Sequence, residues 1–388
     1  MDGDPLAGLD GIDWARHRHA YGSASDVPDL LRALRSADPD ERDAALGELY
    51  TNIHHQGSRY DAAVPAVPFL LALAADPATP GREDLVYLLA ALAVGLDESH
   101  LPGGVAIEEW RAEVGRLLDS GESERRAFEA RHPWVDFEAA RAMTVAELAA
   151  YDAVRAGLPV LRRLMRDPDA AIRTAAAYAL GWFPEDAEES IPALQALLDA
   201  ETVPAVTANA LVSAGLLGGE VLLPRMREHL TGGDPLPRCA AAIALARSGV
   251  TDMPVIAELA AVCGSPPEPS GLTLAFLEGD LRAYAAASLA ALDGAVPAEA
   301  VDAVLEGLSR TSETAAFPLA SAALRLAFGA PNKALPPFGE LTDVQKRAVR
   351  VLGDLSPETW QWVNLWEIVR AWGLPGDRDA CRRYAGLG

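Results

Sequence analysis

The chain has 388 residues, of which 50% are hydrophobic and 23% are charged, a composition typical of a folded protein and not of a disordered one. Its 33 basic residues stand against 56 acidic ones, and a net charge of −23 repels phosphate backbones, which disfavours general nucleic-acid binding. Only Lys333 and Lys346 are lysines, and this arginine bias, with abundant alanine, indicates a GC-rich bacterial genome, so the acidity is also explained as background composition.

Residues 1–25 form a lead-in that carries Trp14, His17, His19 and Tyr21. Two predicted repeats follow over residues 26–96. In the first, Asp26 is placed to cap a helix over 27–35, the residues 37–40 make a turn, and a second helix covers 41–53. The second repeat pairs helices over 62–75 and 84–96.

Residues 97–143 do not fit the repeat period, and we interpret them as an insertion. They contain a predicted helix over 107–118, a charged run over 122–131 and the pair Pro133-Trp134. The stretch from Thr144 to Glu147 has the spacing of a capping box, which predicts that a helix restarts there.

The period is regular over residues 144–330, which we divide into repeats three to seven. Pro159, Pro192, Pro224 and Pro254 lie near the starts of successive first helices, at spacings of 33, 32 and 30 residues. Residues 331–388 form a linker and a helical cap that is rich in tryptophan. The tryptophans of that cap recur at helical spacing, which favours a core over a partner site.

Alternating β-branched runs, which would indicate strands, are missing, so the predicted fold class is all-α. One helical hairpin cannot bury its apolar faces alone, whereas stacked hairpins share a continuous core. The sequence therefore predicts an α-solenoid of stacked helical hairpins.

The units resemble HEAT repeats, in the short form found in bacteria and grouped with phycobilisome-lyase repeats. The resemblance is carried by Asp167-Pro168-Asp169 with Arg173, and by weaker copies at residues 38–42, 233–238 and 279–282. It covers most of residues 26–330 and implies a right-handed solenoid, but no function. It also implies that Arg173, Arg238 and Arg282 bind turn carboxylates between repeats, a structural role.

The sequence contains few motifs that indicate catalysis or the binding of a cofactor or metal. The motifs of zinc proteases, dinucleotide-binding folds and P-loops do not occur. The pairs His17/His19 and His54/His55 lack ligand-specific spacing, so we expect no metal and no cofactor. Three scattered cysteines, without a CxxC pair, indicate reduced thiols. With no signal sequence and no apolar run of membrane-spanning length, we expect a cytoplasmic protein without a membrane partner.

The candidate binding residues lie in two places. The segment 52–60 is more elaborate than a turn requires, and its side chains either form a recognition surface or cap helices and fasten the lead-in. The tryptophans of the insertion are expected to be exposed. The candidate set is His54, His55, Gln56, Arg59, Tyr60, Trp110 and Trp134.

The leading hypothesis is a non-catalytic module that binds a protein or peptide partner. The alternative is a HEAT-like protein of lyase type, with a small ligand in a concave groove. Other enzymes of this architecture are disfavoured, because the His-Glu pairs of deoxyhypusine hydroxylases and the basic groove of alkylpurine glycosylases do not occur here.

Overall fold

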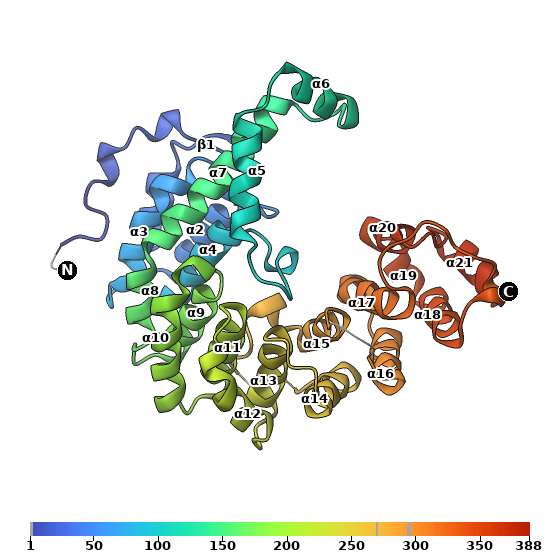
Figure 1. Cartoon of the computed structure of the whole chain (residues 1–388). Helices are drawn as coiled ribbons and strands as arrows, with labels where there is room; N and C mark the ends of the chain where they lie inside the picture. Colours follow the sequence, from blue (N-terminus) through green and yellow to red (C-terminus); the bar gives the residue numbers. More distant parts are fainter. Residues whose placement is uncertain (1–2, 269–270, 293–295) are drawn as a thin grey trace. The chain divides into compact units, whose positions relative to one another are not determined.

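The computed structural model describes residues 3–268, 271–292 and 296–388, and 68% of these described residues are helical. The chain divides into two compact units, residues 1–206 and residues 207–388. Consecutive helices pair as antiparallel hairpins within each unit, which confirms the all-α class and the stack of hairpins (Figure 1).

Unit 1 contains the repeat helices α1 (Val27–Ala33), α2 (Pro39–Asn52), α3 (Ala63–Ala75), α4 (Arg82–Val94), α7 (Phe137–Ala156), α8 (Leu158–Leu164), α9 (Ala170–Leu180) and α10 (Ala187–Ala200). The division between the units falls within α11 (Pro204–Leu216). Unit 2 contains α12 (Leu223–Leu230), α13 (Pro235–Arg247), α14 (Met253–Gly264), α15 (Leu281–Ala290), α16 (Ala298–Ser309), α17 (Ala316–Phe328), α18 (Asp343–Asp354), α19 (Pro357–Trp360), α20 (Val363–Ala371) and α21 (Arg378–Ala385).

The turns inside the hairpins repeat one arrangement. Asp38, Asp169 and Asp234 each accept a backbone N–H with their side chain and so cap the second helix of a repeat. Arg173 donates from Nη1 to the carbonyl of Asp167 at 2.8 Å, while its Nε lies 2.7 Å from the Glu201 carboxylate of the next repeat. This arginine therefore links successive turns, as expected of a structural residue.

The second helices are built from small residues, which lets them pack closely. Ala175, Ala176, Ala177 and Ala179 of α9 are all fully buried. In unit 2, a Cβ at Gly215 would lie 2.8 Å from the Ala244 Cα, so α11 and α13 touch backbone to backbone at this point. The core of each unit is thus a continuous layer between first and second helices.

The structure differs from the prediction in two short antiparallel hairpins near the start of unit 1. Strands β1 (Arg18–His19) and β2 (Gly22–Ser23) pair in the lead-in, and β3 (His54–His55) pairs with β4 (Ser58–Arg59) between α2 and α3. Two-residue strands are too short to show the alternation by which strands are predicted.

Residues 97–143 are divided between the stack and a projecting arm. The arm consists of α5 (Ile107–Leu118), α6 (Glu122–Arg131) and the first turns of α7, and Figure 1 shows α6 at its free end. The predicted restart at Thr144 is wrong, because α7 already begins at Phe137. Asp136 caps it by accepting the Ala139 N–H, and Thr144 lies inside the helix, where its hydroxyl bonds the Ala140 carbonyl.

The C-terminal tryptophans contribute to the core of unit 2 only in part. Trp360 and Trp372 are buried, and their indole N–H groups donate to the carbonyls of Leu352 and Gly329. Trp362 is 44% exposed. Among the helices in the described part of the chain, none combines the length and hydropathy that crossing a bilayer requires.

Candidate binding site

The two β-hairpins of unit 1 share a sequence signature. Residues 19–26 and residues 54–61 both read His-x2-Gly-Ser-x2-Asp. Each copy folds as a hairpin. In the first copy the Gly and Ser form the second strand, whereas in the second copy the Gly completes the turn and the Ser starts the second strand. Each hairpin is followed by the first helix of a repeat. This internal repeat is a sequence signal for the two hairpins, and helical periodicity does not reveal it.

Polar bonds of two aspartates hold the two hairpins together. Asp26 does not cap α1, contrary to the prediction; its two oxygens bind His19 Nε2 at 3.0 Å and Asn52 Nδ2 at 2.9 Å. Asp61, the equivalent residue of the second copy, accepts the backbone N–H of Arg18 at 2.8 Å. Asp26 thus joins the first hairpin to the last residue of α2, two positions before the second copy, and Asp61 joins the second copy to the first hairpin.

The outer surface of these hairpins is exposed. Tyr21 is 66% exposed, and its ring meets the half-buried His55 ring edge to face, with centroids 5.5 Å apart. Leu96, which is 44% exposed, lies against Gly57, where an added Cβ would approach its Cγ to 2.9 Å. We call the set formed by the exposed Tyr21, Gln56 and Leu96 and the half-buried His55 the hairpin ridge.

The tip of the second hairpin is strained. Gln56 and Gly57 occupy the two central positions of the turn with φ of 50° and 87°. A turn with two positive φ values favours Asn-Gly or Gly-Gly, and a residue other than glycine in this region costs about 1–3 kcal/mol. An exposed glutamine is therefore held here at a cost to stability.

Arg59 lies beneath the ridge and is 6% exposed. Its Nη1 donates to the Gly57 carbonyl at 2.5 Å and lies 3.5 Å from the Glu147 carboxylate, while its guanidinium covers the Trp110 ring at 5.6 Å. Burial lowers the pKa of Arg59 and raises that of Glu147. Arg59 therefore joins the second hairpin to α5 and α7.

Two buried histidines flank this arginine. The His54 ring packs edge to face on Tyr50, with centroids 5.8 Å apart, and burial lowers its pKa. The His100 Nε2 lies 2.9 Å from the Val94 carbonyl, and burial lowers its pKa as well. Both imidazoles are held neutral, which suits structural residues better than ligands of an anion.

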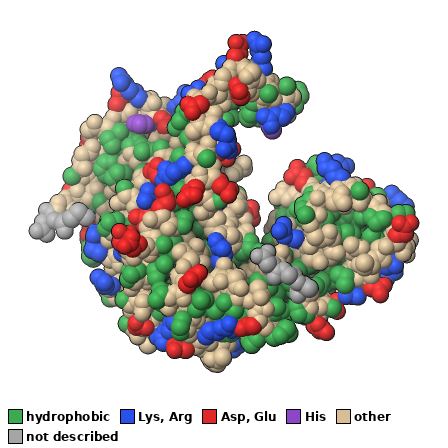
Figure 2. Space-filling model, viewed as in Figure 1, with side chains coloured by type: hydrophobic (Ala, Val, Ile, Leu, Met, Phe, Trp, Pro, Cys, Tyr) green, Lys and Arg blue, Asp and Glu red, His purple; other side chains and the backbone are tan. Residues whose placement is uncertain are grey.

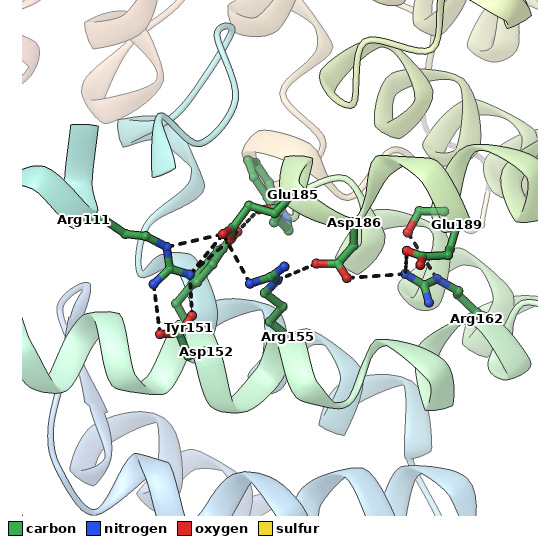
Figure 3. A network of polar contacts seen from close by, with 10 residues as sticks. Arg111, Tyr151, Asp152, Arg155, Arg162, Glu185, Asp186 and Glu189 are labelled. Atoms are coloured by element: carbon green, nitrogen blue, oxygen red, sulfur yellow. Dashed lines mark hydrogen bonds and ion pairs between the residues drawn. The ribbon is translucent and has the colours of Figure 1, made fainter. Parts of the chain in front are cut away.

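The base of the arm is fastened by charge pairs (Figure 3). Arg111 of α5 makes a two-pronged contact with Asp152 of α7, at 2.6 and 3.0 Å, and lies 3.2 Å from Glu185. The neighbouring pairs join Arg155 to Asp186 and Arg162 to Glu189. A shallow hollow of about 780 Å³ lies over this network, and each of its three arginines has an acidic partner.

The structure separates the predicted site residues into three groups. His55 and Gln56 lie on the ridge, with the half-buried Tyr60 next to them in the chain, whereas His54 and Arg59 are buried below it. Trp110, predicted to be exposed, is half-buried between Arg59 and Tyr151. Trp134 is 96% exposed, as predicted, but it lies between α6 and α7 on the arm.

The described residues contain no group of three or more His, Cys, Asp or Glu side chains arranged to hold a metal ion. The three cysteines are buried, and burial raises the pKa of Cys263 and Cys381 to about 12. These thiols are neither accessible nor ionised near neutral pH.

Comparisons with known proteins identify the repeats. A family model described as HEAT repeats matches residues 126–215. No curated protein matches the chain.

Two solved structures are similar at TM-scores below 0.5, too low to support an argument. One is the complex of CpcE and CpcF of phycocyanin lyase from Nostoc sp. PCC7120, with TM-score 0.43, 18% identity, and coverage of 76% of this chain and 93% of that chain. The other is an engineered protein with TM-score 0.27, 21% identity, and coverage of 93% of this chain and 97% of that chain. The family match shows HEAT repeats over residues 126–215, and the helical hairpins of the fold are similar in kind.

Proposed function

We propose that the protein is a non-catalytic binding module for a protein or peptide partner, and that the hairpin ridge is its contact surface. The observation that carries the proposal is the duplicated His-x2-Gly-Ser-x2-Asp hairpin, which exposes Tyr21 and Gln56 above partly buried polar bonds. A simple connection between repeats needs neither the strained tip nor the paired hairpins.

The chemistry of the ridge suits protein recognition. Aromatic residues are enriched at binding hot spots, and Tyr21 offers a ring and a hydroxyl at 66% exposure. Gln56 adds an amide with donors and an acceptor, and Leu96 adds apolar surface. Because the hairpins are fixed by Asp26, Asp61 and Arg59, a partner that binds here orders few side chains, which lowers the entropic cost of association.

The buried state of the thiols favours binding over covalent chemistry on cysteine. In addition, Arg111, Arg155 and Arg162, which line the polar hollow at the base of the arm, each pair with a carboxylate. An anionic ligand in that hollow would have to displace these carboxylates.

The test uses the strained turn. Replacing Gln56 by glycine removes the amide and relieves the positive φ, so Gln56→Gly should raise the melting temperature while it weakens capture of the partner from a native lysate of the source organism. Glu313→Gly is the matched control, since Glu313 in unit 2 has a φ of 54° and is also exposed. It should raise the melting temperature and leave capture unchanged. Full capture by Gln56→Gly and by Tyr21→Ser would overturn the proposal.

A further inference from the structure

The arm encloses a second hollow, distinct from the hairpin ridge. Its volume is about 480 Å³, within the range of ligand-binding pockets. Its walls come from α5, α6 and the first turns of α7. The lining residues are Glu113, Arg116, Leu117, Ser120, Phe128, Arg131, His132, Phe137, Ala140, Arg141 and Thr144.

Aromatic rings give this hollow an apolar part. Phe128 packs on His132 with ring centroids 4.8 Å apart, and it meets Phe137 edge to face at 5.4 Å. Phe137 is buried, while Phe128 is half-buried and His132 is exposed. An apolar side chain that entered the hollow would therefore meet ring faces and edges, which recognise such groups.

The charged groups around the rings are mostly basic. Arg116, Arg131 and Arg141 line the hollow with a single carboxylate, that of Glu113, and Arg141 pairs with Glu138 at 3.3 Å. Among the described residues, the Arg116 guanidinium has no ion pair or hydrogen bond, and that of Arg131 bonds only the Ala127 carbonyl. This contrasts with the base of the arm, where Arg111, Arg155 and Arg162 are paired.

A basic hollow is unusual on a chain of net charge −23. Figure 2 shows arginine and histidine side chains gathered beside hydrophobic ones on the arm. Because guanidinium groups prefer two-pronged contacts with carboxylates, the arrangement complements a carboxylate-bearing segment and not a neutral one.

We propose that the arm hollow binds an acidic peptide segment of a partner protein, with one aromatic or large aliphatic side chain flanked by Asp or Glu. The apolar side chain packs against Phe128 and His132, and the flanking carboxylates pair with Arg116 and Arg131. This site is independent of the hairpin ridge, and it uses a different chemistry.

The test measures binding of a fluorescein-labelled peptide, Gly-Glu-Glu-Phe-Glu-Glu-Gly, to the full chain by fluorescence anisotropy. The expected result is saturable binding that weakens as NaCl rises from 50 to 300 mM. The peptide in which glutamine replaces glutamate should bind at least tenfold more weakly, and so should the all-glutamate peptide without phenylalanine. The Gln56→Gly variant, altered only on the ridge, should bind as the wild type does.

Charge-reversal variants locate the site. R116E/R131E should weaken binding at least tenfold. R125E/R126E makes the same change in charge on α6 at residues that do not line the hollow, and it should bind as the wild type does. Circular dichroism verifies that both variants stay folded. The proposal fails if the acidic peptide does not bind, if both variants weaken it equally, or if a labelled single-stranded oligonucleotide binds more tightly.

Discussion

At the scale of single residues, the segment 54–59 contains buried residues that stabilise the hairpin and an exposed residue that a partner can contact. His54 and Arg59 are buried and bonded inside unit 1, whereas Gln56 is exposed at a turn that disfavours it. Both alternatives that the sequence left open for this segment thus have residues to support them: the buried ones fasten the hairpins, and the exposed ones are free for recognition.

Arg59 and Glu147 should be coupled energetically. Removing one partner of a buried charge pair leaves the other unpaired, so Arg59→Met should lower the free energy of unfolding by about 3 kcal/mol. The double variant Arg59→Met/Glu147→Leu should cost less than the sum of the two single changes, by roughly 0.5–3 kcal/mol. Urea unfolding of the four proteins measures this difference, and strictly additive losses would show that the pair does not interact.

The buried histidines give stability a pH dependence. Burial lowers the pKa of His54 and His100 below the 6.5 of the unfolded chain. Above pH 6.5 both states hold neutral imidazoles and stability does not change with these groups. Below pH 6.5 the unfolded chain binds protons that the folded chain does not, so the free energy of unfolding falls.

The variant His54→Gln/His100→Gln should show a smaller loss of stability than the wild type between pH 7.5 and 5.5, as measured by urea unfolding. The raised pKa of Glu147 acts in the opposite direction, since its protonated form is favoured in the folded state, but both proteins carry Glu147, so its effect is common to the two profiles. Identical pH profiles for the two proteins would contradict the assignment.

At the scale of elements, residues 97–143 combine a fastened base with a free tip. Tyr178 donates its hydroxyl to Asp97 at 3.3 Å, and Trp110 and Arg111 contact Tyr151 and Asp152. The tip, from Ser120 to Val135, includes α6, which packs on α7. We propose that only this tip is an appendage.

Replacing residues 120–135 by a four-residue Gly-Ser linker should leave the helical circular dichroism and the melting temperature nearly unchanged, because α5 and α7 are already packed side by side. Deleting all of residues 97–143 should instead prevent folding, since it removes the contacts of His100, Trp110 and Arg111. A folded chain after the larger deletion would show that these contacts contribute little.

The helical elements were largely predictable, while the site was not. The helix over 107–118 was predicted with the bounds that α5 has, because caps and apolar spacing are local signals. The start of α7 was placed at Thr144, since a capping-box spacing inside a helix looks the same in sequence as one at its end. The burial of Trp110 and Arg59 depends on residues far away in the chain, such as Glu147, which lies 147 − 59 = 88 positions after Arg59, and no local pattern encodes such contacts.

At the scale of the whole molecule, the net charge of −23 sets which partners can approach. Long-range repulsion acts against polyanions, whereas a short-range basic hollow can still bind a small acidic segment once it is within about one Debye length, ~10 Å at 0.1 M salt. The arginines at the turns and at the base of the arm are mostly paired, so they do not form a continuous basic track.

Duplex DNA should therefore not bind at physiological salt. A mobility-shift assay with a 30-base-pair duplex at 150 mM NaCl should show no complex at micromolar protein, because phosphate contacts need clustered basic residues. A salt-dependent complex at nanomolar protein would contradict this expectation.

The hairpin ridge is tested most directly by photo-crosslinking in the source organism. Benzoylphenylalanine at position 21 and at position 56 should crosslink the same partner species, whereas the same group at Met253 in unit 2, which is 60% exposed against 66% for Tyr21, should not. Efficient crosslinking to that partner from position 253, with none from positions 21 and 56, would contradict the assignment of the ridge as the contact surface.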